Sequence, residues 1–237
     1  MNIFMEGMTA SLKPFNGQAY LAIHSNKPLY TLNSSIWGGG FGYHDTIVNR
    51  QVHKSYLSDD PVEEMHQFLV LCGEQPETTA GMLTAAYVRD MGHSTEMLSW
   101  SASDEKIETL RVSSWSTVGL GNAARAGVTK DQSLLYPGTI NIIVVIDGIL
   151  TDSAMVNAVI TATEAKAAVL EDLGIKVKNE AYGATGTTTD AIVIASTQRG
   201  REHAYAGTAT KLGYLIGKTV YEATKASALL YYKAVGF

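Results

Sequence analysis

The chain has 237 residues, of which 46% are hydrophobic and 17% are charged, and its formal net charge at pH 7 is −5. Soluble proteins carry about 25% charged residues, so this composition excludes a disordered chain and predicts a compact, weakly charged globule. The acidic balance also excludes a broad nucleic-acid surface, because such a surface needs clustered Lys and Arg to neutralise phosphates.

Cys72 is the single cysteine, which excludes an internal disulfide and any paired CxxC metal site. The N-terminal sequence MNIFMEGMTASLKPF has no basic segment followed by an apolar run, so it does not resemble a secretory signal. The longest apolar run, INIIVVI at 140–146, is too short to span a bilayer. We therefore expect a cytoplasmic protein that forms one domain over residues 1–237, without a membrane or nucleic-acid partner.

The first half of the chain reads mainly as strands, and the second half adds long helices. Strand-like runs bounded by Gly, Asn and Asp lie between residues 20 and 118, namely YLAIHS, PLYTLNSSI, TIVNRQV, GMLTAAYV and KIETLRVSSW. One helix interrupts them, DPVEEMHQFLVLCG, with Asp60 as its cap, Pro61 at its first position and Gly73 at its end.

After these runs, the sequence predicts a strand at 139–146, a helix at 152–173, a Thr-rich loop leading into the strand AIVIAS, and a helix at 205–233. Strands first and helices later predict an α+β fold with a mixed, largely antiparallel sheet packed against helices.

Two glycine-rich segments predict turns. The first follows a strand, where missing side chains let the chain wrap a bulky partner or bend sharply, and its candidate ligand-binding residues are Trp37, Gly38, Gly39 and Gly40. The second, GLGNAA at 119–124, fits the dinucleotide pattern GxGxxA, but Gly127 follows too closely for a crossover helix. A tight turn that directs the Asn122 amide toward a ligand or its own backbone is the preferred interpretation.

Two amides lie inside predicted strands. Asn49 interrupts TIVNRQV, and Asn141 shares one face of its strand with Thr139, Ile143 and Val145. Polar groups at one end of an apolar face predict the rim of a pocket. The alternative is an amide that bonds the backbone of a neighbouring loop.

One lysine lies on the buried face of the helix predicted at 152–173. At 100° per residue Lys166 falls within an apolar stripe, whereas Glu164 lies on a different side. A lysine on a buried face must extend to water, find a carboxylate or line a site. Glu164 by itself is typical of a solvated helix residue.

The Thr-rich loop ATGTTTDAIVIAS at 184–196 looks like a site. Thr185 and Thr187 supply hydroxyls, Gly186 permits close backbone approach, and Asp190 stands where the loop becomes a strand. A turn whose hydroxyls bond their own backbone is the alternative. Of the six histidines, His203 follows this loop most closely and is the acid/base candidate.

Common catalytic motifs are absent from the sequence: it contains no HExxH, GxSxG or Walker loop. Its scattered His, Asp and Glu residues neither imply nor exclude a metal ion.

Four strings in the second half, in this order, resemble the adenosylcobinamide amidohydrolase family of corrinoid salvage: PGTINIIVVID, TATEAKAAVLEDLGI, ATGTTTDAIVIAS and YAGTATKLGYLIGKTVYEA. WGGG, GMLTAA and GLGNAARAG agree more loosely, so the resemblance covers roughly Leu29 to Ala223. It implies hydrolysis of the amide joining a corrin-ring propionate to aminopropanol, giving adenosylcobyric acid. The cobalt-containing corrinoid is then the substrate, and no further cofactor is expected.

Amide hydrolysis needs an activated water or nucleophile, an oxyanion stabiliser and an acid for the leaving amine. Our hypothesis assigns water activation to Asp190 or Glu164, the oxyanion to Lys166 or the loop amides near Gly186, and protonation of the amine to His203. A threonine nucleophile from 185–189, activated by Lys166, is the alternative mechanism. A corrinoid-binding protein without catalysis and a nucleotide-binding module are the alternative functions, and a homo-oligomer is one option for assembly.

Overall fold

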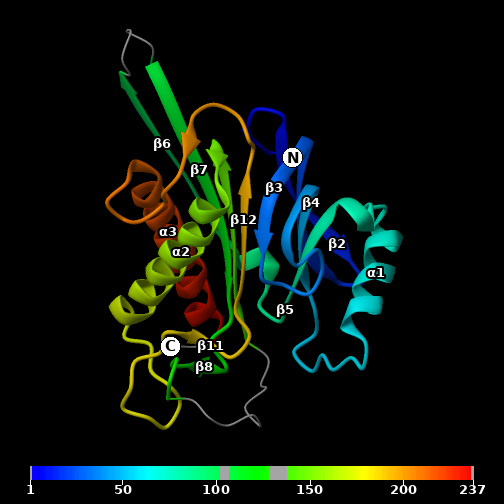
Figure 1. The fold of residues 1–237 in the computed structure, drawn as a ribbon. Coiled ribbons are helices and arrows are strands. Elements are labelled where there is room, and N and C mark those ends of the chain that lie inside the picture. Colours follow the sequence, from blue (N-terminus) through cyan, green and yellow to red (C-terminus); the bar gives the residue numbers. More distant parts are fainter. Residues whose placement is uncertain (1, 102–106, 129–137, 236–237) are drawn as a thin grey trace.

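A strongly curled, nine-stranded sheet forms the centre of the fold (Figure 1). The computed structural model describes residues 2–101, 107–128 and 138–235. Two residues of the predicted motifs lie outside these ranges, Lys106 at the start of KIETLRVSSW and Pro137 of PGTIN. The described residues have the predicted α+β class, because three α-helices pack on this mixed, largely antiparallel sheet.

The large sheet has the order β1-β2-β3-β12-β9-β7-β6, and β4 and β5 extend it from β3. Its strands are β1 (Asn2–Met5), β2 (Met8–Phe15), β3 (Gln18–Asn33), β4 (Gly40–Gln51), β5 (Thr79–Thr84), β6 (Gly92–Ser101), β7 (Ile107–Val118), β9 (Ile140–Asp147) and β12 (Ala191–Ser196). The β4–β5 and β9–β12 pairs are parallel. Short strands form two further pairs, β8 (Ala123–Ala124) with β11 (Gly186–Thr187) and β10 (Ile149–Leu150) with β13 (Glu202–His203).

Strand β3 joins the two halves of the sheet. Its first part pairs with β2 and its last residues pair with β12. Its register with β4 shifts between His24 and Leu29, and such a bulge bends a strand and increases its twist. The sheet therefore curls around an inner core that includes Ile23, Ile143 and Val193.

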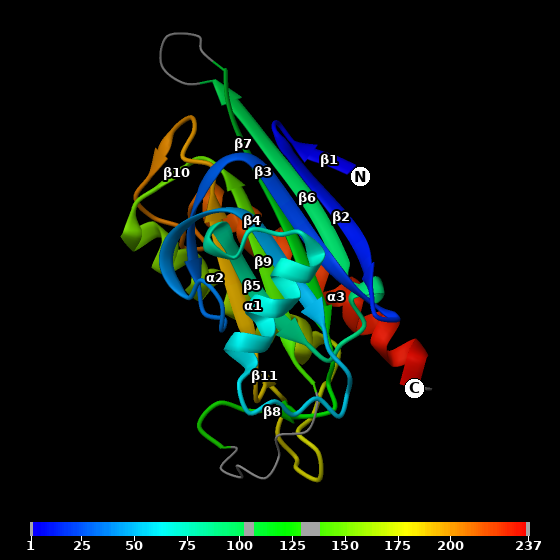
Figure 2. The same ribbon diagram turned by 90° about the vertical axis from the view of Figure 1, so that its right-hand side faces the viewer.

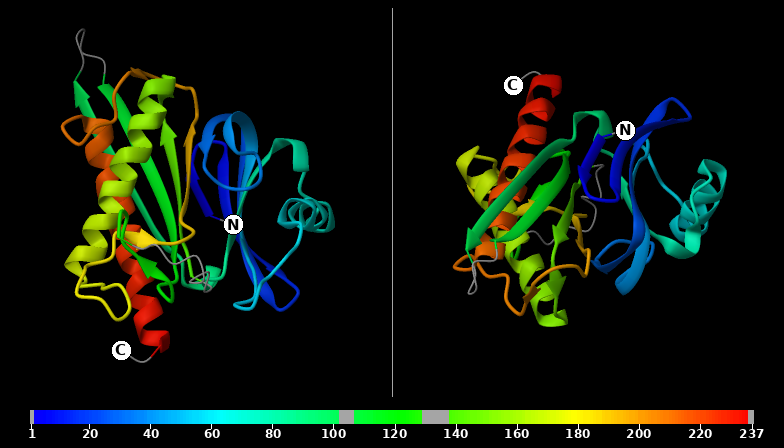
Figure 3. Two further views of the ribbon diagram at one scale, coloured as in Figure 1. Left: turned by 60° about the horizontal axis from the view of Figure 1, so that its bottom comes forward. Right: turned by 90° about the horizontal axis from the view of Figure 1, so that it is seen from above.

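Helices cover two parts of the outer face. On the outer face, helices α2 (Asp152–Asp172) and α3 (Lys211–Val235) lie together against one part of the curled sheet, and α1 (Pro61–Cys72) lies against a separate part (Figure 3). Figure 2 views the molecule from the side of α1. Apolar side chains of β9 and β12 pack under α2 and α3, whereas Ala22 and Val48 pack under Phe68 of α1. No helix among the described residues has the length and apolar character needed to cross a membrane.

Helix ends follow local capping groups. The predicted limits of α1 are confirmed, since Asp60 accepts a hydrogen bond from Glu63 N and Gly73 takes a left-handed conformation with φ 72°. Helix α3 begins at Lys211 and not at 205 as predicted. The reason is Thr210, whose hydroxyl accepts a 2.9 Å hydrogen bond from Gly213 N and thereby caps the helix.

Glu74, directly after α1, is a buried carboxylate that joins this helix to the sheet. Its side chain accepts a 2.7 Å hydrogen bond from Lys13 Nζ and is hydrogen-bonded to His24 Nε2 at 2.8 Å. Burial raises the pKa of the Glu74 carboxyl, but its hydrogen bonds to His24 and Lys13 outweigh burial and lower the pKa from 4.5 to about 2.

We expect Glu74→Gln to lower the free energy of unfolding at neutral pH by about 2 to 3 kcal/mol. Because the folded-state pKa lies below the unfolded value, this stabilisation is fully present above pH 4.5 and is lost as the pH falls toward about 2. Urea unfolding of wild type and variant at a series of pH values checks this. A difference between the two proteins that stays constant on acidification would contradict the prediction.

Candidate active site

The Thr-rich loop lies where β9 and β12 begin. These strands are parallel neighbours, with Asn141 opposite Ala191, so the residues that precede them meet at one edge of the sheet. The short β8–β11 pair holds the loop there, with Gly186 opposite Ala124. Thr185 strengthens this attachment, because its hydroxyl accepts a 3.0 Å hydrogen bond from Ala126 N. The fold thus brings the GLGNAA turn against the Thr-rich loop.

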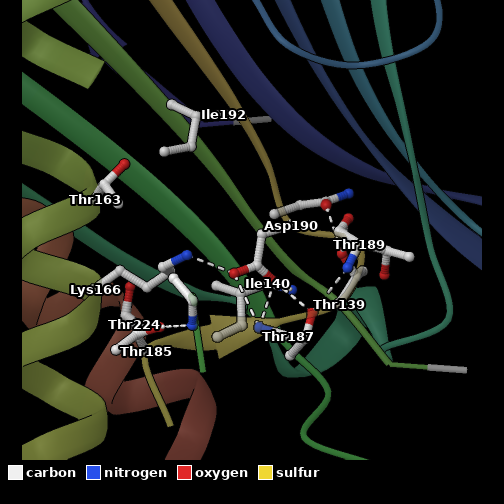
Figure 4. Close-up of polar contacts among 12 residues, drawn as sticks. Thr139, Ile140, Thr163, Lys166, Thr185, Thr187, Thr189, Asp190, Ile192 and Thr224 are labelled. Atoms are coloured by element: carbon white, nitrogen blue, oxygen red, sulfur yellow. Dashed lines mark hydrogen bonds and ion pairs between the residues drawn. The ribbon is translucent and has the colours of Figure 1, made fainter. Parts of the chain in front are cut away.

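The Asp190 carboxylate accepts hydrogen bonds from four groups (Figure 4). Lys166 Nζ lies 2.5 Å from its Oδ2, and Ile140 N lies 3.0 Å from its Oδ1. Thr187 contributes the other two, its backbone N–H at 3.1 Å from Oδ2 and its hydroxyl to Oδ1. These donors fix the orientation of the carboxylate and occupy most of its acceptor positions.

Lys166 reaches Asp190 from α2. Its side chain is 8% exposed and that of Asp190 is 13% exposed, so the ion pair is largely removed from water. The prediction that Lys166 points inward is therefore confirmed, and a carboxylate is the partner it finds. Among the described residues Asp190 is the one hydrogen-bond partner of the ammonium, which leaves two of its N–H groups for a ligand or water.

Gly186 lies so close to this ion pair that no side chain fits at its position. A Cβ there would overlap Asp190 Oδ2 and would lie 2.8 Å from Lys166 Nζ. We expect Gly186→Ala to displace the pair and to lower turnover by at least about tenfold, because small misplacements of reacting groups slow catalysis strongly.

Gly183 provides the matched control for this substitution. A Cβ at Gly183 would meet neighbouring atoms only at 3.8 Å or more, so Gly183→Ala should leave turnover nearly unchanged. Steady-state kinetics of the two variants check the prediction, and equal rates for both would contradict it.

Asn49, Asn141 and Thr139 lie behind the loop and not on the rim of a pocket. All three are at most 4% exposed. Asn141 Nδ2 donates to Asn49 Oδ1 at 2.9 Å and to Leu83 O at 2.8 Å, and Thr139 Oγ1 lies 2.7 Å from Thr189 O. The rim interpretation is corrected because both faces of β9 are buried, so these polar groups bond to one another and support the loop from inside the sheet.

Asn122 forms the predicted turn and directs its amide at the loop. Its Nδ2 donates a 2.6 Å hydrogen bond to Thr188 Oγ1, and its Oδ1 is buried without a partner in the described residues. Residues 123–124 form β8, where a nucleotide-binding fold would begin its helix. This arrangement agrees with the tight turn and opposes the dinucleotide interpretation.

The glycine corner after Trp37 lies beside the site. Trp37 itself is structural, since its Nε1 donates a 2.9 Å hydrogen bond to Pro76 O. Gly38 and Gly40 have φ of 64° and 86°, and Gly39 and Gly40 are exposed. Ser34, just before the corner, accepts a 2.8 Å hydrogen bond from Ile192 N and so ties this segment to β12.

Asn33 is a residue of this corner that sequence reasoning missed. Its Nδ2 donates to the carbonyl oxygens of Trp37 at 2.7 Å and Gly38 at 3.0 Å, which fixes the path of the corner. The signal was present, because Asn followed by two serines after a strand is a turn signature.

The structure does not bring His203 or Glu164 to this cluster. His203 lies on β13 beside Leu150, beyond the opposite end of β9 and β12, roughly 20 Å from Asp190 for a six-residue strand. Burial lowers the pKa of His203. Glu164 is exposed on the side of α2 that faces α3, close to Tyr214 and Lys218. In the part of the chain that the structure describes, no group of three His, Cys, Asp or Glu residues is arranged to hold a metal ion.

The sequence profile described as adenosylcobinamide amidohydrolase matches residues 5–236. The chain belongs to the adenosylcobinamide amidohydrolase family. It is 28% identical over 200 residues to an adenosylcobinamide amidohydrolase of Halobacterium salinarum, covering 82% of this chain and 78% of the relative. It is 27% identical over 197 residues to one of Methanosarcina mazei, covering 79% and 84%. The predicted resemblance is therefore confirmed, and the protein is an enzyme that hydrolyses an amide bond.

Two further proteins are similar to this chain. An uncharacterized protein of Methanocaldococcus jannaschii is 44% identical over 84 residues, which cover 35% of this chain and 32% of the relative. A solved structure of a Pyrococcus horikoshii protein aligns with 94% of this chain and 83% of its own, with a TM-score of 0.47 and 13% identity.

In this member of the adenosylcobinamide amidohydrolase family, Thr187, Asp190 and Lys166 form one hydrogen-bonded cluster. A hydroxyl donates to a carboxylate, and a third group orients that carboxylate. Thr187 is half-buried. The arrangement can therefore activate a hydroxyl beside a positive charge.

Proposed function

We propose that the protein hydrolyses adenosylcobinamide at the amide that joins aminopropanol to a corrin-ring propionate, releasing aminopropanol and adenosylcobyric acid. The observation that carries this proposal is the hydrogen-bonded series Thr187, Asp190 and Lys166 at the edge of the sheet, in a chain of this family. The product retains the corrin ring and is suited to re-entry into cobalamin synthesis, so a role in corrinoid salvage follows.

In the first step, Thr187 Oγ1 attacks the amide carbonyl carbon and its proton passes to Asp190, to which it is already hydrogen-bonded. Negative charge develops on the carbonyl oxygen. The Lys166 ammonium, held beside Asp190, supplies the positive charge that stabilises this oxyanion. Protonated Asp190 then donates its proton to the departing nitrogen, the C–N bond breaks, and a Thr187 ester remains.

In the second step, water attacks the ester carbonyl, Asp190 accepts the proton of the water, and Thr187 regains its hydroxyl hydrogen as the carboxylic acid leaves. This assignment makes Asp190 first the base and then the acid in each of the two steps. It replaces His203 as the acid for the leaving amine, because His203 lies at the other end of β12. Activation of water by Asp190 in the first step has less support, since the Thr187 hydroxyl and other donors within the protein occupy most of its acceptor positions. Formation of the ester removes the Thr187 hydroxyl hydrogen and leaves Oδ1 able to accept from water in the second step.

Incubation of the purified protein with adenosylcobinamide, followed by mass spectrometry, tests the function. We expect aminopropanol and adenosylcobyric acid to accumulate in equal amounts. Intact adenosylcobinamide that remains bound to the protein would instead establish a corrinoid-binding protein without catalysis. Tight NAD binding without corrinoid binding would establish the nucleotide-binding alternative.

A further inference from the structure

The outer face of the sheet is uncovered between α1 and α2 and carries large apolar side chains. Strands β3 and β4 continue the sheet past the edge of α2 (Figure 1), and in the described ranges no helix lies over this part of them. Four side chains are exposed there by 46% to 63%, and we call them the α2–β4 patch: Phe41, Tyr43, Val156 and Ile160. Exposed apolar clusters of this kind mark binding surfaces more often than isolated exposed residues do.

Tyr30 connects the two sides of the α2–β4 patch. Its ring stacks on Phe41 at a centroid distance of 5.7 Å and lies 5.1 Å from the ring of Tyr43. Its hydroxyl donates a 2.6 Å hydrogen bond to Asp152 Oδ1 of α2. Asp152, Val156 and Ile160 follow one another at four-residue spacing and so share one flank of the helix. The aromatic and aliphatic parts therefore form one surface.

The α2–β4 patch is continuous with the candidate active site. Asp190, Ile192 and Ile194 share one face of β12, and Phe41 lies on the same face two strands away, through Leu32. Four residues along β12 and two strand spacings place Phe41 roughly 16 Å from Asp190. Helix α2 also connects the patch with the candidate active site, because it carries Val156 and Ile160 of the patch and, further along, Lys166 of the site.

We propose that the α2–β4 patch binds the apolar face of the corrin macrocycle, so that the side-chain amide reaches Thr187. This inference rests on the proposed function and deepens it. The reacting amide lies on a side chain of the ring, so the ring can lie beside the reacting atoms while that side chain extends to them. The stacked rings of Tyr30 and Phe41 offer a flat surface to the macrocycle. Gly39 and Gly40, which precede Phe41 in the chain, are exposed and carry no side chains that would obstruct it.

Three protein variants test the proposal. Phe41→Ala removes the stacked ring, and the double variant Tyr43→Ser/Ile160→Asn changes the two most exposed side chains of the patch, which contribute least to folding. The control Val70→Asn/Leu71→Ala makes a comparable change on α1, where these side chains are 56% and 75% exposed. For each protein, KM and kcat are measured with adenosylcobinamide, and Kd is measured by equilibrium dialysis in the background of Thr187→Val.

We expect both patch variants to raise KM and Kd by at least about tenfold while kcat changes less than about twofold, because they remove binding area far from the reacting atoms. The control should match the wild type. If the wild type binds adenosylcobinamide without hydrolysing it and the patch variants lose binding, the proposed function fails and the patch assignment stands. Unchanged KM and Kd overturn the patch assignment, as does light scattering that shows the variants only converting a dimer into a monomer.

Discussion

Thr187→Val is expected to lower kcat for adenosylcobinamide by at least about 10³-fold, which corresponds to about 4 kcal/mol of transition-state stabilisation. Valine keeps the shape of threonine and removes the hydroxyl that donates to Asp190 Oδ1. The reaction then loses its nucleophile, whereas the ion pair between Lys166 and Asp190 and the surface around it remain. Single-turnover kinetics with excess enzyme measure the chemical step directly.

Thr188→Val is the matched control for the nucleophile. Thr188 is the next residue in the loop, is exposed, and bonds to Asn122 and not to Asp190. Its replacement should change kcat by less than about tenfold. In the wild type, a rapidly quenched reaction should also contain an ester whose mass equals that of the enzyme plus adenosylcobyric acid minus one water, attached to the peptide with Thr187. Full activity of Thr187→Val would remove threonine from the mechanism and return water activation by Asp190 to consideration.

Asp190→Asn is expected to abolish turnover and also to destabilise the fold by about 3 kcal/mol, because it leaves the buried Lys166 ammonium without its carboxylate. Lys166→Met should have a smaller effect on stability, since the carboxylate keeps the donors Thr187 and Ile140. The double variant Lys166→Met/Asp190→Asn leaves no unpaired charge. It should therefore be less destabilised than the sum of the two single variants, by about 1 to 3 kcal/mol.

Urea unfolding of the four proteins gives this coupling energy, and steady-state rates at a temperature where all four are folded give the catalytic effect. Additive destabilisation would show that Lys166 and Asp190 do not act as a pair. Turnover close to that of the wild type in folded Asp190→Asn would contradict its role in proton transfer.

Local signals in the sequence predicted the helices and the strands around the site. Asp60, Pro61 and Gly73 set the limits of α1, and the apolar stripe of α2 placed Lys166 on the buried face. Both signals act within one or two helical turns, so they can be read without knowing the rest of the fold. Strands β1, β2 and β6 were not predicted individually, because strand propensity depends on packing against neighbouring strands, which a single run of sequence does not show.

The composition of the site was predicted in part. The Thr-rich loop, Lys166 and Asp190 were candidates, but nothing in the sequence paired them, because the pair depends on how α2 packs on β12. Asn49 and Asn141 were assigned to a pocket rim, since a strand pattern cannot show that both faces of β9 are covered. His203 was chosen for its closeness in sequence, which does not measure distance when a six-residue strand separates it from Asp190.

The sequence by itself therefore determined the family and the α+β class, and it predicted the stretch 184–196 as the centre of the candidate site, because motifs and periodicity are local properties of the chain. The tertiary structure decided which of those residues meet. Parallel pairing of β9 with β12 places both strand starts at one edge, and the curl of the sheet buries the amides behind them. The hydroxyl of Thr187, the carboxylate of Asp190 and the ammonium of Lys166 come together there because long-range strand pairing and helix packing, and not sequence spacing, set their distances.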